Sequence, residues 1–417
     1  MKLGDAWPNF RPGILETHKK GRCDDIAGDY LYAGAWLDDS GKAGGGIRIY
    51  EIQIDGTLKL VSHVAEDIAA GYIAVSQDGN NLYAVNEIKR RPDCVHTEGG
   101  IYAYEMNQTN GTLKELNHVS SCGVFPNYLV PAPDNRCLYA VNYGSEDMVV
   151  RSRKNKEGEW ILEEVYEESG MVSLDILKDG SLSPVRDLHI FSGNPSRYFE
   201  WFQAAPHPHC IGLDPTGNML LSTDRGCDQI LTCQYDEKQK KFYNVHIYKT
   251  MHGIGPRNCI FHPTLFYVYV VGEVKPYVTV YKYEPLKAEL MELESYLTAD
   301  EGMEYKQEGE FFSFAHPSDI KIHPNGKMLY VANRGPDTIA CFEILEENGK
   351  LRHLTDVSSE GKWPWSMEFT QDGKYLYVAN KMSGHISMFS MDEKGIPHFS
   401  GKTYEAERTV CLKCVKI

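Results

Sequence analysis

The sequence contains no hydrophobic run long enough to cross a membrane and no apolar segment near its first residue. Its longest apolar stretch lies around Ile260 to Val271 and is interrupted by His262 and Pro263, whereas a spanning helix needs about 20 apolar residues. The first ten residues carry no apolar core of the kind found in signal peptides. We therefore expect no membrane partner, no secretion and a cytoplasmic location.

Several motifs of common enzyme classes are also missing. The chain has no G-x-S-x-G nucleophile elbow, no P-loop, and no G-x-G-x-x-G after a predicted strand. Serine chemistry of the hydrolase-fold type and nucleotide binding therefore have no support. The sequence gives no reason to expect a cofactor.

Positive charge is scarce, because 43 Lys and Arg residues stand against 58 Asp and Glu residues, which gives a net charge of -15. A surface with this charge repels phosphate at long range, so we expect no nucleic-acid partner. An anionic ligand must then be attracted by arginine or lysine side chains gathered at one place.

The 11 cysteines are odd in number and scattered, and many lie within apolar runs. This usage is typical of reduced core residues. Cys411 and Cys414 have C-x-x-C spacing, but on a strand their sulfur atoms point to opposite faces. Pro206-His-Pro-His209 alternates histidines without a third ligand at a suitable spacing. We therefore expect no metal site.

What the sequence does contain is a repeat that begins with a proline. Each copy has Pro, a variable residue, two apolar runs separated by a turn signal, and a partner residue 16 positions after the variable one. Two short strands joined by a hairpin give this pattern, with the proline at the head of the first strand. The variable residue and its partner should therefore lie side by side. The five pairs are Asn127 with Tyr143, His209 with Arg225, Arg257 with Glu273, Ser318 with Arg334, and Trp365 with Lys381.

Alignment on the second strand extends the repeat to seven copies across the chain. A period near 50 residues with four strand candidates per copy predicts an all-β protein. We expect a seven-bladed β-propeller with four antiparallel strands per blade, which forms one domain over residues 1–417. The anchor positions are Tyr32, Tyr83, Tyr139, Leu221, Tyr269, Tyr330 and Tyr377, spaced by 51, 56, 82, 48, 61 and 47 residues.

The first copy lacks its first strand, because the residues before Tyr32 are polar. Thr409 to Ile417 has the alternation of such a strand. We predict that this C-terminal strand pairs beside Asp29 to Trp36 and closes the ring, which removes exposed sheet edges.

The two longest intervals predict insertions. Residues 151–170 are charged and centred on a turn signal, which indicates an extra hairpin. Residues 286–307 contain Leu286, Leu290, Leu293 and Leu297 at helical spacing, which indicates an amphipathic helix on the rim. Either insertion could form a homodimer contact, although we expect both to pack on their own blades.

In a closed propeller the first strands line the central channel, so the paired positions should form a ring of polar side chains at one mouth. His209 is the natural general base, because an unperturbed imidazole titrates near neutral pH. Arg257 and Arg334 can hold a carboxylate or phosphate or stabilise an oxyanion. Glu273 can orient the Arg257 guanidinium or act as an acid or base. We predict substrate contacts from Arg225, Lys381, Asn127, Tyr143, Glu87 and Trp365.

Three segments resemble the lactonase family of seven-bladed propellers, which includes propeller-type 6-phosphogluconolactonases and the fungal carboxy-cis,cis-muconate cyclase. They are Pro208 to Gly217, His252 to Asn258 and Ser318 to Gly335. The resemblance implies a metal-free reaction at a lactone, with His209, Arg257, Arg334 and Glu273 in the active site.

From the residues and this resemblance together we expect hydrolysis of an anionic sugar lactone, 6-phosphogluconolactone in particular. Two alternatives stay open. One is a lyase or cycloisomerase of the muconate cyclase type, in which His209 and Glu273 move protons on an unsaturated dicarboxylate. The other is a propeller that binds a small ligand without turning it over.

Overall fold

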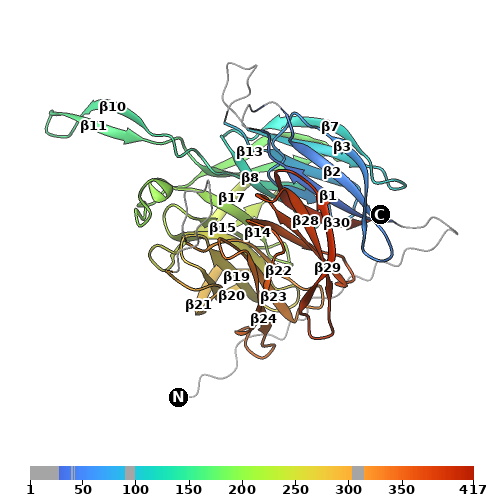
Figure 1. Cartoon of the computed structure of the whole chain (residues 1–417). Coiled ribbons are helices and arrows are strands. Elements are labelled where there is room, and N and C mark those ends of the chain that lie inside the picture. Colours follow the sequence, from blue (N-terminus) through green and yellow to red (C-terminus); the bar gives the residue numbers. More distant parts are fainter. Residues whose placement is uncertain (1–27, 39–40, 42, 90–98, 303–313) are drawn as a thin grey trace.

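The computed structural model describes residues 28–38, 41, 43–89, 99–302 and 314–417. It consists of seven four-stranded antiparallel sheets arranged as blades around a central channel (Figure 1). The predicted fold class is confirmed. None of the helices in the described residues is long and apolar enough to span a membrane.

Blades 1 to 3 are built from strands with the following bounds. Blade 1 contains β3 (Leu58–Val64), β2 (Gly46–Ile52), β1 (Asp29–Ala35) and β30 (Thr409–Lys416); blade 2 contains β4 (Ile73–Val75), β5 (Asn81–Asn86), β6 (Gly100–Met106) and β7 (Leu113–Ser120); blade 3 contains β8 (Pro126–Pro131), β9 (Cys137–Asn142), β12 (Gly170–Ile176) and β13 (Leu182–Ile190).

Blades 4 to 7 use their strands in simple sequence order. Blade 4 contains β14 (Pro208–Leu213), β15 (Leu220–Asp224), β16 (Gln229–Asp236) and β17 (Lys241–Lys249); blade 5 contains β18 (Pro256–Phe261), β19 (Tyr267–Gly272), β20 (Tyr277–Glu284) and β21 (Glu289–Leu297); blade 6 contains β22 (His316–Ile322), β23 (Met328–Arg334), β24 (Thr338–Ile344) and β25 (Leu351–Ser358); blade 7 contains β26 (Pro364–Phe369), β27 (Tyr375–Asn380), β28 (His385–Met391) and β29 (Pro397–Glu405). A short 3-10 helix, η1 (Glu200–Gln203), precedes blade 4.

The C-terminal strand closes the ring, as the sequence predicted. β30 pairs antiparallel with β1, with Asp29 opposite Lys416 and Gly34 opposite Cys411. The inner strands of neighbouring blades contact each other all the way round, in the order β30, β4, β8, β14, β18, β22, β26 and back to β30. Closure therefore leaves no inner sheet edge open to solvent.

In five blades the repeated anchor tyrosine joins the blade to the next one. Its ring is buried between blades, and its hydroxyl donates a hydrogen bond to a backbone carbonyl in the turn before the outermost strand of the neighbouring blade. A buried hydroxyl needs such a partner, which explains why the anchor is tyrosine and not phenylalanine. The pairs are Tyr32 with Gly111, Tyr83 with Gly180, Tyr269 with Gly349, Tyr330 with Gly395 and Tyr377 with Gly56.

A β-bulge follows the proline of the repeat in five blades. In β18, for example, Pro256 pairs with Gly272 and Asn258 pairs with Val271, so that Arg257 has no partner in the ladder. A bulge re-aims the side chain of the extra residue. The same register shift leaves these variable positions unpaired at the channel mouth: Asn127, His209, Arg257, Ser318 and Trp365.

The predicted helix over residues 286–307 is wrong. The segment instead forms β21, the outermost strand of blade 5, paired with β20. Leu290 packs against the cluster between blades 4 and 5, and Leu293 against the cluster between blades 5 and 6. Both faces of a strand between two blades are apolar, so leucines spaced by three residues do not require a helix. Residues 303–307 lie outside the described residues.

The predicted hairpin within residues 151–170 is confirmed as β10 (Val149–Lys154) and β11 (Trp160–Val165). It forms a separate two-stranded sheet that extends away from blade 3 (Figure 1). The expectation that it packs on its own blade is therefore wrong. Trp160 and Leu162 stay more than two-thirds exposed, because the arm is too narrow to cover its own side chains.

Candidate active site

All ten predicted site residues line one cavity of about 450 Å³ at the channel mouth. They are His209, Arg257, Glu273, Arg334, Arg225, Lys381, Asn127, Tyr143, Glu87 and Trp365. They come from blades 2 to 7, and the repeat brings them together because each lies at the start of a first strand or just after a second strand. Trp36, just after β1 of blade 1, completes the wall.

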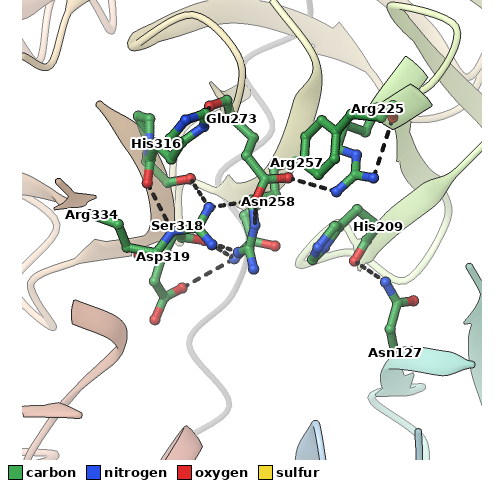
Figure 2. A network of polar contacts seen from close by, with 12 residues as sticks. Asn127, His209, Arg225, Arg257, Asn258, Glu273, His316, Ser318, Asp319 and Arg334 are labelled. Carbon is green, nitrogen blue, oxygen red and sulfur yellow. Dashed lines mark hydrogen bonds and ion pairs between the residues drawn. The ribbon is translucent and has the colours of Figure 1, made fainter. Parts of the chain in front are cut away.

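A single buried carboxylate lies at the centre of the charged part of this cavity (Figure 2). Oε1 of Glu273 accepts hydrogen bonds from Arg334 and, at 3.2 Å, from Nε of Arg257, and Oε2 accepts one from Nη1 of Arg225 at 3.2 Å. All four side chains are at least 95% buried. Blades 4, 5 and 6 thus place three guanidinium groups around one anion.

The guanidinium groups are also fixed by the backbone. Arg257 donates to the Ser318 carbonyl, and Nε of Arg334 donates to the His316 carbonyl at 2.9 Å. The ring of Trp365 lies 5.3 Å from the Arg257 guanidinium carbon and 4.7 Å from that of Arg334. Such contacts hold a planar cation in one orientation, so the arginines are preorganised for an anionic group.

These contacts decide the protonation state of Glu273. Burial alone would raise the pKa of this carboxyl, but attraction to Arg334, Arg257 and Arg225 holds the pKa well below its ordinary value. Glu273 is therefore a permanent anion. The geometry fits the predicted role of orienting guanidinium groups and does not fit the alternative role of an acid or base.

His209 lies in the β-bulge at the start of β14 in blade 4, near the Arg257 side chain. Asn127 donates a hydrogen bond to its carbonyl at 3.4 Å, and the ring of Tyr143 meets the imidazole edge to face at 6.0 Å. Nδ1 is buried and has no hydrogen-bond partner among the described residues. Burial, together with the charge of Arg257, lowers the pKa of His209 to about 3. The expected titration near neutral pH is therefore wrong, and the imidazole is uncharged at pH 7.

Next to the arginines, the cavity wall also carries two tryptophans, a lysine and a carboxyl. The rings of Trp36 and Trp365 meet at 71° with centroids 4.9 Å apart. Nζ of Lys381 lies 4.9 Å from both ring centroids. Nε1 of Trp36 donates to Oε2 of Glu87 at 2.7 Å. Trp363 also lines the cavity, with its ring 5.5 Å from the Arg334 guanidinium carbon and almost fully buried.

Sequence reasoning missed several residues of the wall. Glu146 lies in the loop after β9 and accepts hydrogen bonds from Arg225 and the Tyr143 hydroxyl, both at 2.7 Å. Its loop has no place in the repeat, so no periodic signal could reveal it. Asp319 and Lys321 are alternate residues of β22 and line the deeper channel. Their i, i+2 spacing on a first strand was a signal that both face inward.

His207 does not form a metal site with His209. Its imidazole stacks on the Tyr143 ring at 4.5 Å, and Nδ1 lies 3.2 Å from the Tyr143 carbonyl. No group of three His, Cys, Asp or Glu side chains in the described part of the chain is arranged to hold a metal ion.

The fold and the cavity together define a seven-bladed propeller with a polar cavity at one mouth of its channel. The sequence profile described as "Lactonase, 7-bladed beta-propeller" matches residues 30–414. The chain belongs to this family.

Named relatives agree with this assignment. A 6-phosphogluconolactonase of Bacillus subtilis is 27% identical over 376 residues, covering 89% of this chain and 95% of the relative. A 6-phosphogluconolactonase of Formosa agariphila is 25% identical over 368 residues, covering 87% and 92%. The structure of a periplasmic gluconolactonase of Pseudomonas aeruginosa superimposes with a TM-score of 0.77 at 24% identity, covering 93% of this chain and 99% of that one, which shows the shared fold.

Proposed function

We propose that this protein hydrolyses a sugar lactone that carries an anionic group, with 6-phosphogluconolactone as the best candidate. The observation that carries the proposal is the meeting of three guanidinium groups around one buried carboxylate, Glu273. Three positive charges thus surround one negative charge at this point of the cavity, in a protein whose net charge is -15. The names of the relatives support a lactone as the substrate.

In the proposed reaction the lactone carbonyl lies between Arg257 and His209. The imidazole accepts a proton from water as the water oxygen attacks the carbonyl carbon, and Arg257 stabilises the negative charge that develops on the carbonyl oxygen. Arg334, with Arg225 or Lys381, holds the anionic tail. Because Arg257 lowers the pKa of His209, an anionic substrate that offsets this charge makes the imidazole more basic when it is needed.

The alternative reaction on an unsaturated dicarboxylate assigns proton transfer to Glu273. This role requires a carboxyl that takes up and releases a proton. The three arginines prevent it, because they hold the pKa of Glu273 well below its ordinary value. Hydrolysis needs no such step from Glu273.

The substrate can be tested by comparing 6-phosphogluconolactone, generated in the assay, with glucono-δ-lactone. We expect turnover of both, with a lower KM for the phosphorylated lactone. The variant Lys381→Met should raise the KM for the phosphorylated lactone about tenfold, the scale of one charged hydrogen bond, and leave the KM for glucono-δ-lactone unchanged. If neither lactone is hydrolysed faster than in buffer, the proposed function is wrong.

A further inference from the structure

Among the described residues that line the cavity, one carboxyl group forms no ion pair. Five carboxyl side chains line the cavity, and four of them form an ion pair. In the described part of the chain Glu87 forms none; its carboxyl accepts a hydrogen bond from the Trp36 indole, 2.7 Å from Oε2. The four pairs are Glu146 with Arg225 at 2.7 Å, Asp147 with Lys89 at 3.0 Å, Glu273 with Arg257 at 3.2 Å and Asp319 with Lys321 at 3.8 Å.

The backbone makes room for Glu87 at this place. Glu87 follows β5, and its carboxyl lies against Gly71, where an added Cβ atom would stand 1.9 Å from Oε2. A side chain at position 71 would force the Glu87 carboxyl to move. With Oε2 held by Trp36, the carboxyl lines the cavity from blade 2, whereas His209 and Arg257 line it from blades 4 and 5.

The electrostatic surroundings favour the protonated form. Burial raises the pKa of Glu87 to about 7, against the opposing influence of the Trp36 hydrogen bond and the charges of Arg257 and Lys381. At neutral pH this carboxyl therefore carries its proton about half of the time. His209, whose pKa is lowered to about 3, is uncharged under the same conditions. The cavity thus offers a proton acceptor on one wall and a proton donor on another, which is the division of roles that acid-base catalysis uses.

We propose that Glu87 is the general acid of lactone hydrolysis and protonates the ring oxygen as it leaves. The inference rests on the proposed function. An alkoxide is a poor leaving group, so opening of the ring is easier when the departing oxygen gains a proton.

Each proton and electron pair in the proposed step has a donor and an acceptor. The water oxygen bonds to the carbonyl carbon while His209 takes one water proton. The electron pair on the carbonyl oxygen then restores the C=O bond, the ring C–O bond breaks, and the ring oxygen takes the Glu87 proton. The products are the hydroxy acid, protonated His209 and the Glu87 carboxylate. Proton return from His209 to Glu87 restores the enzyme, and the acid releases its own proton to solvent.

The test is the pH dependence of kcat/KM for glucono-δ-lactone, corrected for spontaneous hydrolysis. We expect the wild-type value to fall above about pH 7, as Glu87 loses its proton. Glu87→Gln keeps an acceptor for Trp36 and should fold with an unchanged Tm. It should lower kcat at least tenfold at pH 6, because general acids contribute about 10²- to 10⁴-fold, and should abolish the fall above pH 7. Compared with Glu87→Gln, Glu87→Asp should restore part of the rate and the decrease of kcat/KM above pH 7.

Glu146→Gln is the matched variant, since Glu146 lines the same cavity and burial, with the charge of Glu273, raises its pKa to about 7 as well, but it is paired with Arg225. It should keep the fall above pH 7. A Glu87→Gln enzyme with the wild-type pH profile, or loss of the fall in Glu146→Gln instead, would overturn the role of Glu87 while leaving lactone hydrolysis intact. Absence of any lactone turnover in the wild type would overturn the proposed function and this role together.

Discussion

Glu273 and Glu87 line the same cavity, yet their carboxyl groups have opposite surroundings. Glu273 contacts three guanidinium groups, which hold its pKa well below the ordinary value. Glu87 accepts a hydrogen bond from an indole, and burial raises its pKa to about 7. One mouth therefore combines a permanent anion that fixes the arginines with a carboxyl that exchanges its proton near neutral pH.

Loss of the Glu273 charge should damage both stability and activity. In Glu273→Gln the guanidinium groups of Arg225, Arg257 and Arg334 face each other without their shared anion. Removal of one partner of a buried ion pair costs about 3–5 kcal/mol. We expect urea denaturation to show a decrease of this size in the free energy of unfolding. The rate of lactone hydrolysis should fall at least a hundredfold. Glu87→Gln is the control and should unfold like the wild type; equal stability of the two variants would contradict the central role of Glu273.

Two buried histidines should each make the fold less stable as the pH falls below about 6.5. His207 and His316 are almost fully buried, and burial lowers the pKa of each to about 4. The unfolded chain takes up protons at these residues below about pH 6.5, whereas the folded chain does so only near pH 4. Each histidine should therefore contribute stability at pH 7 that is reduced by about 2 kcal/mol at pH 5.

Urea denaturation at pH 7 and pH 5 measures the direction and size of this change in the free energy of unfolding. The free energy of unfolding should fall between pH 7 and pH 5 by about 2 kcal/mol less in His316→Gln than in the wild type. His118→Gln, at a half-exposed site on blade 2, controls for removal of a histidine as such. An identical loss in His316→Gln and in the wild type would contradict the argument.

Two deletions should have opposite effects on folding. Removal of residues 409–417 takes away β30, the inner strand of blade 1, and exposes the edge of β1. The product should be insoluble or unfolded. Replacement of residues 149–165 by a short glycine-serine linker removes the projecting hairpin and should leave a soluble chain with a cooperative thermal transition. A folded 1–408 chain would contradict closure by β30.

The sequence was most informative where the repeat places residues. The spacing of Arg257 and Glu273 predicted a contact that the structure has, because a proline-headed hairpin returns the chain to the same end of a blade. The bulge that re-aims Arg257 was not predicted, since one extra residue leaves no trace in the alternation of apolar positions.

Prediction was poorer outside the repeat. Glu146 lies in a loop whose course depends on tertiary contacts with Arg225 and Tyr143. The low pKa of His209 depends on burial and on a charge from the next blade, so the residue type alone gave the wrong titration range. The leucine spacing around Leu293 predicts a helix, because successive leucines of this strand pack on opposite faces, against two different clusters.

The most direct measurement is the rate of lactone hydrolysis by His209→Ala at pH 7, determined together with its melting temperature. The His209 Nδ1 atom has no hydrogen-bond partner among the described residues, so the Tm should stay within a few degrees of the wild type. Loss of the proton acceptor should lower kcat/KM for 6-phosphogluconolactone at least a hundredfold. A variant that melts like the wild type and hydrolyses the lactone at the wild-type rate would contradict the account.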